Sequence, residues 1–555
     1  MFQTLKNYKY MPVILTGIFL FLFSSVTLAQ ISRQWVNRFN GTANSFDIVS
    51  ELIPDDSGNV FVYGTSFNNS TLTDFTILKY SSSGIPLINK SFNYGTNSYD
   101  QLKTAVRDND GNSYLVGLTS QGTDNNKLLT VKLNPNADQE WSSIYNKDGY
   151  FNFIGKDIIY FNNFIYVLAN ATFSNGRKDE FLLKYNPQGQ LINENILTVP
   201  GSITMESLNL TFSGNGFLVS SSTVNFSNTI SRLHIIVYNQ NLQSQSIFPL
   251  SVSLGLERFI KLIKVDSDKF YFTGTKVTPL NDVDFQFGSL TVENSGSVSL
   301  NWTRTFNGSG NHYDFPFDIA SDSENNIYIT GSSRNGSILG TEDVVTLKYS
   351  PSGNLIWQKN YNSLTNGIDQ GMSITVDNSG NVYVGGASDL GNVKLAFLIL
   401  KYSLSGNLLF EDKYSYAENP EDFVYSVAVN NSNDFFITGI SFNPGTDYDF
   451  ATLKYSASSF VTYNNELINS FKLNQNYPNP FNPETNISFS LIKSGIVSLN
   501  VFDSKGLFVK KLINEFKISG EYNYKFNADD LPSGIYFYKL DSDNYSQSKK
   551  MILIK

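Results

Sequence analysis

Short runs of β-branched and aromatic residues alternate with polar turns along most of the chain, and one arrangement of these runs returns. Residues 58–80 read GNVFVYGTSFNNSTLTDFTILKY, and residues 380–402 read GNVYVGGASDLGNVKLAFLILKY. Each segment contains two apolar runs of strand length that are separated by a polar loop. The pattern therefore predicts β-strands and indicates an internal repeat.

The repeat can be counted on the last residue of the second run. The equivalent positions are Tyr80, Leu133, Tyr185, Tyr238, Val292, Tyr349, Tyr402 and Tyr455, with spacings of 53, 52, 53, 54, 57, 53 and 53. Each period contains four candidate strands, which in the first full copy lie near 50–54, 59–64, 75–80 and 87–92. Four antiparallel strands repeated radially predict a β-propeller, because no single sheet of this kind can bury both of its faces.

Turn residues and small residues recur at fixed places in each period. DDSGN at 55–59, DNDGN at 108–112 and DNSGN at 377–381 have the chemistry of tight hairpins. Six residues beyond the turn stands a small residue, which we expect to let neighbouring sheets approach closely. These residues are Gly64, Gly117, Ala169, Ser220, Gly274, Gly331, Gly386 and Gly439.

The two ends of the repeat region predict a closed ring. A fourth, outer strand follows seven of the eight anchor positions, and several of these strands carry a tryptophan (Trp141, Trp302 and Trp357). After Tyr455 the chain offers only SASSFVTYNN, whereas QWVNRF at 34–39 precedes the first unit. We expect this N-terminal strand to complete the last blade and to protect its edge. Eight blades are predicted, with seven as the alternative because repeats three to five are degenerate.

The first 29 residues have the pattern of a secretory signal peptide. Lys6 and Lys9 precede an apolar run, and small residues lead to a cleavage position after Ala29. A membrane anchor is the alternative, but the run from Met11 to about Ser24 is shorter than the ~20 residues that a span needs. We therefore expect export and no transmembrane span in the mature chain.

The amino-acid composition excludes several classes of partner and catalytic site. The net charge is -9 with no basic stripe, so nucleic acid is not an expected partner. With no cysteine and only two histidines, His234 and His312, thiolate chemistry is excluded and a histidine-based zinc site or catalytic triad is disfavoured. No cofactor and no metal site are predicted.

The C-terminal part has a different composition. Its beginning contains three closely spaced prolines, Pro478, Pro480 and Pro483. The alternating strand and turn patterns that follow predict a small Ig-like β-sandwich. The expected organisation is a signal peptide at 1–29, a propeller at 30–460, a linker at 461–475 and the sandwich at 476–555. The fold class is thus all-β, a β-propeller followed by a small sandwich.

Both folded regions resemble known families. The strings D-x-x-G-N-x-Y-V-x-G, D-F-x-x-x-K-Y and G-x-x-x-W, clearest at 318–361, resemble the SBBP-type bacterial β-propeller repeat. NYPNPFNPET at 476–485, DSKG at 503–506 and PSGIYFYKL at 532–540 resemble the type A C-terminal sorting domain of the type IX secretion system. The matching sorting-motif residues are Pro478, Pro480, Pro483, Gly506, Gly520, Gly534 and Tyr536.

The resemblance implies a route to the cell surface. A signal peptide would bring the chain to the periplasm, and the type IX machinery would recognise the C-terminal domain for translocation across the outer membrane. Such domains are commonly removed outside, with the cargo attached to surface lipopolysaccharide or released. The propeller family implies an extracytoplasmic setting, but a fold does not imply an activity.

Two series of aspartates recur in register and are the candidate ligand-binding residues. We expect both to lie in loops on one face of the ring, where they would form an acidic face for a cation, a cationic polymer or a glycan. The alternative is that they cap turns and accept backbone hydrogen bonds, which is usual for a residue repeated in every blade. The first series is Asp47, Asp100, Asp314, Asp369 and Asp422, and the second is Asp74, Asp179, Asp343 and Asp449.

Two function classes remain open from the sequence. One is a non-enzymatic surface protein whose propeller mediates adhesion or captures an extracellular glycan or protein. The other is a secreted hydrolase or lyase acting on polysaccharide, which requires two converging carboxylates with unique partners. No unrepeated set of this kind is visible, and residues 196–262 are dominated by Ser, Leu and Asn. The binding protein is the preferred interpretation, and no catalytic residue is assigned.

Overall fold

The computed structural model describes residues 31–457, except 121, 123–124, 228–229, 251–256, 279–281, 310–311, 335–339, 393 and 418–419. It also describes 471–555, except 492–494, 518–519 and 543–544. The predicted signal peptide and residues 461–470 of the predicted linker lie outside these ranges. The chain divides into two compact units, Met1–Ser458 and Ser459–Lys555. Within the described residues, no helix has the length and apolar character needed to cross a membrane.

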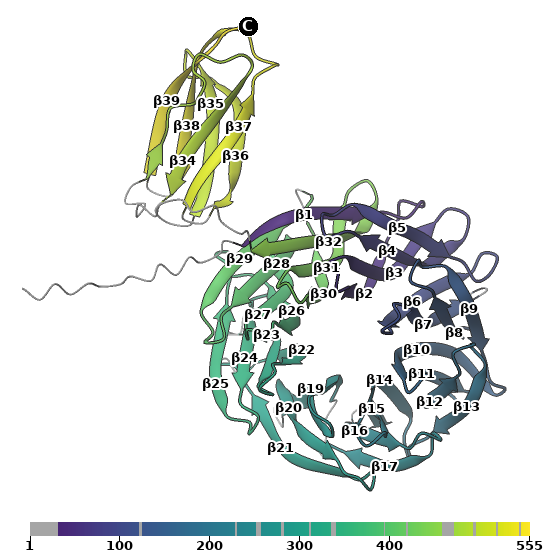
Figure 1. Ribbon diagram of the computed structural model, residues 1–555. Helices are drawn as coiled ribbons and strands as arrows, with labels where there is room; N and C mark the ends of the chain where they lie inside the picture. Colours follow the sequence, from purple (N-terminus) through teal and green to yellow (C-terminus); the bar gives the residue numbers. More distant parts are fainter. Residues whose placement is uncertain are drawn as a thin grey trace, which may run out of the picture. The chain divides into compact units, whose positions relative to one another are not determined.

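The first unit is a ring of antiparallel four-stranded blades, numbered from the N-terminal side (Figure 1). A single parallel bridge joins blades 1 and 2 (Thr73 with Tyr99) and another joins blades 3 and 4 (Lys178 with Thr204). Blade 1 contains β2 (Ile48–Pro54), β3 (Val60–Asn68), β4 (Leu72–Tyr80) and β5 (Pro86–Phe92). Blade 2 contains β6 (Tyr99–Arg107), β7 (Ser113–Ser120), β8 (Lys127–Leu133) and β9 (Gln139–Tyr145). Blade 3 contains β10 (Tyr150–Phe161), β11 (Phe164–Phe173), β12 (Lys178–Tyr185) and β13 (Leu191–Leu197). Blade 4 contains β14 (Thr204–Phe212), β15 (Leu218–Ser227), β16 (Ile230–Tyr238) and β17 (Ser244–Pro249).

The second half of the ring repeats this arrangement. Blade 5 contains β18 (Phe259–Lys264), β19 (Lys269–Val277), β20 (Val283–Val292) and β21 (Val298–Phe306). Blade 6 contains β22 (Asp314–Ser321), β23 (Ile327–Arg334), β24 (Glu342–Tyr349) and β25 (Leu355–Tyr361). Blade 7 contains β26 (Asp369–Val376), β27 (Val382–Asp389), β28 (Leu395–Tyr402) and β29 (Leu408–Tyr414). Blade 8 contains β30 (Phe423–Val429), β31 (Phe435–Asn443), β32 (Asp447–Ala457) and β1 (Ile31–Phe39).

The N-terminal strand closes the ring, as the sequence predicts. Strand β1 pairs antiparallel with β32, from Ile31 opposite Ala457 to Phe39 opposite Phe450. Figure 1 shows β1 as the outermost strand of the last blade. The described residues thus form eight blades of four strands, which confirms the propeller fold and resolves the choice between seven and eight blades.

Neighbouring blades pack through the recurring small residues. A Cβ placed on Gly64 of blade 1 would lie 2.5 Å from Cζ of Phe450 in blade 8. A Cβ on Gly117 would lie 2.8 Å from Cζ of Phe75, one blade earlier. Each position also faces a carbonyl of its own first strand, as Gly64 faces Ile48. The predicted role is confirmed here, because the glycine makes room for an aromatic ring of the preceding blade.

Outer-strand tryptophans join successive blades around the circumference. The indole Nε1 of Trp141 in blade 2 donates to the carbonyl of Pro187 in the next blade at 2.9 Å. The indoles of Trp302 and Trp357 make the same contact with the carbonyls of Pro351 and Leu404. The hairpin glycine beside each acceptor lies against the ring, so that a Cβ on Gly189 would be 2.5 Å from Cδ2 of Trp141. Each of these tryptophans therefore links its own blade to the next one by a hydrogen bond and a ring contact.

Each innermost strand carries a bulge, at which one residue has no opposite partner on the second strand. The skipped residues are Ser50, Lys103, Lys156, Leu208, Ile260, Phe317, Met372 and Tyr425. The residue after the bulge binds the next blade in several cases. Asp157 Oδ2 accepts the N–H of Leu210 at 2.7 Å, and Asp318 Oδ2 accepts the N–H of Ile374 at 2.9 Å. The bulges thus supply hydrogen bonds between sheets near the centre of the ring.

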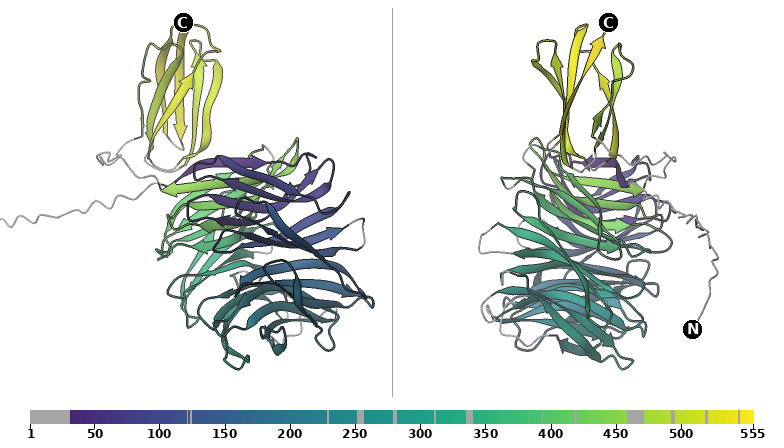
Figure 2. Two further views of the ribbon diagram at one scale, coloured as in Figure 1. Left: turned by 45° about the vertical axis from the view of Figure 1, so that its right-hand side comes forward. Right: turned by 90° about the vertical axis from the view of Figure 1, so that its left-hand side faces the viewer.

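The second unit is a two-sheet sandwich (Figure 2). One sheet has the order β33 (Lys472–Leu473), β34 (Glu484–Leu491) and β37 (Gly520–Asn527). The other has the order β36 (Phe508–Lys517), β35 (Gly495–Asp503), β38 (Gly534–Ser542) and β39 (Tyr545–Leu553). Alternate residues of both sheets, including Phe489, Val501 and Tyr538, form a hydrophobic core of its own.

Candidate functional site

The first aspartate series lies where the innermost strands begin, and its side chains face into the loops. Asp47 accepts the N–H groups of Gly41 and Phe67 at 2.8 and 2.9 Å. Asp369 accepts the N–H of Ser363 at 2.6 Å and the hydroxyl of Ser388. Burial raises the pKa of Asp47 to about 7 and that of Asp422 to about 6.

The second series lies where the third strands begin, at the same ends of the sheets. Asp74 accepts the hydroxyl of Thr71 at 2.7 Å. Asp449 accepts the hydroxyl of Thr446 at 2.9 Å and forms an ion pair with Arg38 at 3.0 Å. Every residue of the two series is at most 9% exposed, and each series is distributed around the ring, one residue to a blade. This geometry favours loop bracing over direct contact with a ligand.

The repeat is broken at one interblade position. The third-strand residue in register with Phe75, which packs against Gly117 of the next blade, is apolar in seven blades and is a glutamate, Glu180, in blade 3. Its registered partner there is Asn170, where blade 1 has Thr65 opposite Phe75. The apolar equivalents are Phe75, Leu128, Ile235, Phe285, Val344, Phe397 and Phe450.

Residues from blade 4 surround the carboxyl group of Glu180, which is fully buried. It accepts the hydroxyls of Ser207 and Ser222 at 2.6 Å each, Ser220 at 2.8 Å and Tyr238 at 2.6 Å. Burial and the nearby Glu180 raise the pKa of Tyr238 well above its usual value, so its hydroxyl stays protonated and donates. Ser220 stands at the small-residue position, so a Glu–Ser hydrogen bond replaces the Phe–Gly contact of other blades.

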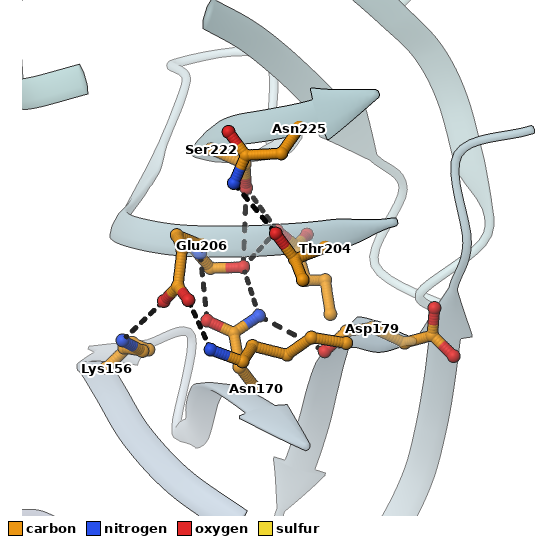
Figure 3. A network of polar contacts seen from close by, with 10 residues as sticks. Lys156, Asn170, Asp179, Thr204, Glu206, Ser222 and Asn225 are labelled. Carbon is orange, nitrogen blue, oxygen red and sulfur yellow. Dashed lines mark hydrogen bonds and ion pairs between the residues drawn. The ribbon is translucent and has the colours of Figure 1, made fainter. Parts of the chain in front are cut away.

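A polar pocket of about 310 Å³ opens beside this cluster. Three blades contribute to it: Asn126 from the β7–β8 loop, Asn152 and Lys156 from β10, and Glu206 from β14. Asn170 lines the pocket and also binds the buried cluster, because its Nδ2 donates to Ser207 Oγ at 3.0 Å. Figure 3 shows Glu206 and Asn170 on facing elements with Lys156 beside Glu206. The pocket therefore lies directly next to the place where the repeat is broken.

Two ammonium groups flank the single carboxylate among the described lining residues. Lys156 Nζ lies 3.3 Å from Glu206 Oε2, and Lys178 from β12 donates to Glu206 Oε1. Burial raises the pKa of Glu206, but the two lysines outweigh it and hold this pKa below the usual value. The group is therefore an ionised anchor that positions two cations, and the lining carries one net positive charge. Among the described residues, no group of three or more His, Asp or Glu side chains could hold a metal ion.

Sequence reasoning did not identify these residues. The aspartates were candidate residues because they recur in register. The pocket and cluster residues do not recur, because they stand at positions where the blades differ: Lys156, Lys178, Glu180 and Glu206. Aligning the blades on their anchor residues would have shown Glu180 where other copies have Phe, Leu, Ile or Val. The spacing of these residues along the sequence does not predict that three blades contribute to one pocket.

The sorting-motif residues lie in the turns and at strand ends of both sheets of the sandwich. Pro478 and Pro480 are exposed, and the carbonyl of Pro478 accepts Asn476 Nδ2 at 3.1 Å and Thr485 Oγ1 at 2.8 Å. The carbonyl of Pro483 accepts the N–H of Ala528 at 3.0 Å. The segment is also tied to the last strand, because Asn479 Oδ1 accepts the N–H of Ile552 at 2.9 Å.

The remaining motif residues serve strands and turns of the same unit. Gly506, with φ of 80°, completes the turn capped by Asp503, and Tyr536 donates to the carbonyl of Pro532 at 2.8 Å. Gly520 and Gly534 are the first residues of β37 and β38. The spaced motifs thus specify one folded element.

Family models match part of the propeller and the C-terminal unit. Residues 475–555 match the secretion system C-terminal sorting domain, and residues 301–338 match the β-propeller repeat named SBBP. The chain therefore carries a type IX sorting domain and an SBBP repeat. None of the curated proteins matches the sequence.

Several solved structures are similar in part. PorZ of Porphyromonas gingivalis, described as a bacterial surface component of the type IX secretion system, aligns over 94% of this chain and 100% of its own at 9% identity, with a TM-score of 0.20. Prolyl oligopeptidase B from Galerina marginata aligns over 72% and 55% at 8% identity, with a TM-score of 0.40. Drosophila Semaphorin 1a aligns over 64% and 86% at 9% identity, with a TM-score of 0.38.

The sorting domain and the propeller together support a coarse statement of function. The chain is a β-propeller protein that is secreted or displayed at the cell surface, and its C-terminal domain is recognised by the type IX machinery.

Proposed function

We propose that this protein is a non-enzymatic binding or adhesion scaffold, carried to the cell exterior by its C-terminal domain. The observation that carries the proposal is the division of labour between repeated and unrepeated residues. The repeated aspartates are buried in loop hydrogen bonds, whereas polar groups that line an open pocket converge where the repeat is broken. A rigid ring with a polar pocket beside the place where its repeat is broken is suited to holding a ligand.

The charge state of the pocket argues against hydrolysis of a glycosidic bond. Such hydrolysis uses two carboxyl groups, one of which has a raised pKa so that it can donate a proton. The described lining residues contain one carboxylate, Glu206, whose pKa is lowered by Lys178 and Lys156 despite its burial. Glu180 is close but fully buried, so it does not reach a substrate.

The route is part of the same proposal. Residues 1–29 act as the signal peptide, 30–460 form the secreted propeller, 461–475 link it to the sorting domain, and 476–555 engage the translocation machinery. After export, the sorting domain is removed and the propeller is attached to surface lipopolysaccharide or released. A glycan or an extracellular protein is the proposed ligand, and direct binding by the nine aspartates is the weaker version of this proposal.

A binding array tests the proposed function. The chain from residue 30 onward is presented to immobilised glycans and matrix proteins, and in parallel is incubated with soluble polysaccharides to measure release of reducing ends. Saturable binding without turnover is expected. Turnover of a polysaccharide, with no binding to any arrayed molecule, would establish the hydrolase or lyase alternative instead.

A further inference from the structure

The pocket between blades 2, 3 and 4 offers more hydrogen-bonding groups than the protein itself uses. Neither the side-chain amide of Asn126 nor that of Asn152 has a hydrogen-bond partner among the described residues, although each is half-buried. Asn152 lies near the start of the inner strand β10 with a φ of 55°, in the left-handed region, and lines the pocket. Two adjacent amides can donate to and accept from neighbouring hydroxyl groups, as saccharide rings require.

Glu206 positions the two lysine ammonium groups of the pocket but leaves some of their hydrogen-bond donors free for a ligand. Lys156 and Lys178 each contact Glu206, and each ammonium carries three donors. The shared carboxylate fixes both groups in place and leaves one net positive charge to be neutralised by a ligand. A single carboxylate on the ligand matches this charge, whereas a cationic ligand would meet two ammonium groups.

Size and polarity limit the ligand further. The volume of about 310 Å³ is at the lower end of the range for small-molecule sites. Ile154 supplies an apolar surface on the pocket wall, and the aliphatic stems of the two lysines can add to it. A compact ring with one apolar face, several hydroxyls and one acidic group fits these conditions.

We propose that this pocket binds a uronate residue of an acidic saccharide, with its carboxylate at Lys156 and Lys178 and its hydroxyls at Asn126 and Asn152. The inference deepens the proposed function, on which it rests, by naming a site and a ligand class. The buried Glu180 cluster acts beneath the site as a positioning element, because Asn170 belongs to both.

Calorimetry on the chain from residue 30 onward tests the inference with a galacturonate disaccharide and with its neutral galactose counterpart. The acidic disaccharide is expected to bind, more weakly at higher salt, and the neutral one at least about tenfold more weakly, since it lacks the charge-assisted hydrogen bonds to the two lysines. Equal affinity for both sugars, or absence of binding by the acidic sugar at millimolar concentration, would overturn the inference.

Variants separate the pocket from the rest of the ring. Lys156→Ala and Asn152→Gly should each weaken binding of the acidic disaccharide about tenfold or more, and glycine at position 152 keeps the left-handed backbone unstrained. Lys103→Ala is the matched control, because Lys103 occupies the same bulge position one blade earlier but does not line the pocket. It should change affinity no more than about threefold, as expected for a screened neighbouring charge.

The outcomes also separate this inference from the proposed function. If the variants melt like the wild type and still bind the acidic sugar equally well, the site is wrong. If the array shows binding that these variants retain, the scaffold function stands and its ligand lies elsewhere. If the array is silent and a polysaccharide is degraded, the proposed function itself fails.

Discussion

The indole Nε1 of Trp35 donates a hydrogen bond to the carbonyl of Ser82 at 3.2 Å, joining the last blade to the first. Trp35 belongs to β1, the N-terminal strand, and Ser82 lies in the hairpin of blade 1. Beside it, a Cβ on Gly84 would lie 2.7 Å from Cγ of the Trp35 ring. The tryptophan contact that links neighbouring blades elsewhere therefore also joins the last blade to the first.

Trp35→Ala should destabilise the propeller by about 3 kcal/mol, since it removes the interblade hydrogen bond and leaves a cavity. Urea unfolding of the chain from residue 30 onward measures the change. Trp357→Ala is the matched control, because it removes the equivalent tryptophan contact between blades 6 and 7. Deletion of residues 31–39 should be more harmful than either substitution, because it exposes the edge of β32. A deletion that unfolds like the wild type would show that closure does not depend on β1.

Gly117→Ala should destabilise the fold by about 1–3 kcal/mol, because its Cβ would lie 2.0 Å from the carbonyl of Gln101 and 2.8 Å from the Phe75 ring. Ala169→Gly, at the same position of blade 3, is the control and should cost no more than about 1 kcal/mol. Thermal melting compares the two. Equal tolerance of both changes would mean that the small-residue position does not control interblade packing.

Glu180→Ala should cost about 3 kcal/mol or more, because it leaves several buried hydroxyls without their acceptor, each worth ~1–3 kcal/mol. Glu180→Gln should cost less, since hydroxyls can rotate to accept from its amide. The free energy of unfolding in urea measures both changes. A stable Glu180→Ala variant would show that water or repacking satisfies the cluster.

Stability should depend on pH through Asp47. Burial raises its folded pKa to about 7, although the N–H groups of Gly41 and Phe67 lower it, so the folded state keeps a proton that the unfolded state releases near pH ~3.9. The contribution of Asp47 to stability is therefore greatest below pH ~4 and falls as the pH rises to about 7. Relative to Asp47→Asn, which does not titrate, the wild type should lose stability across this window.

Asp55→Asn provides a control of opposite sign. Burial acts to raise the pKa of Asp55, but the hydrogen bonds from Asn59 and the contact with Lys79 lower it overall. The wild type should gain stability over this variant as pH rises through the acidic range and lose it as pH falls. Melting temperatures across the acidic and neutral pH range measure both pairs, and parallel profiles would contradict the assigned shifts.

Removal of residues 476–555 should abolish export to the cell exterior and leave the propeller in the periplasm of a type IX-competent host. A reporter protein with residues 1–29 at its N-terminus and residues 471–555 at its C-terminus should in turn be exported, because the C-terminal segment folds around its own core. Fractionation and immunoblotting measure both proteins. A reporter that stays inside would show that the propeller contributes to recognition.

Much of the fold is readable from the chain because each blade is local. Asp55, Gly58 and Gly64 define a hairpin and a close approach within ten residues, and the same turn chemistry returns at 108–112 and 377–381. Even closure could be predicted, since a missing strand after Tyr455 and a spare strand at 34–39 are both visible in the sequence.

The repeated aspartates show the limit of that reasoning. Their register is visible in the sequence, but whether Asp47 faces solvent or the backbone depends on the path of the loop from Gly41 and on Phe67. A repeated polar residue and a repeated binding residue have the same spacing. Burial distinguishes the two.

The sequence by itself determined the period, the four-strand unit and the ring closure, because these follow from turn chemistry and local periodicity, and its spaced C-terminal motifs indicated the sorting domain. The tertiary structure fixed the number of blades at eight in the described residues. The tertiary structure decided where the unrepeated polar groups converge. Only the packing of successive blades brings Asn126, Lys156 and Glu206 from three blades to one pocket. Only sheet packing turns Glu180 from an irregularity in the repeat into a carboxyl group enclosed by four hydroxyls, because such contacts arise between blades rather than within one.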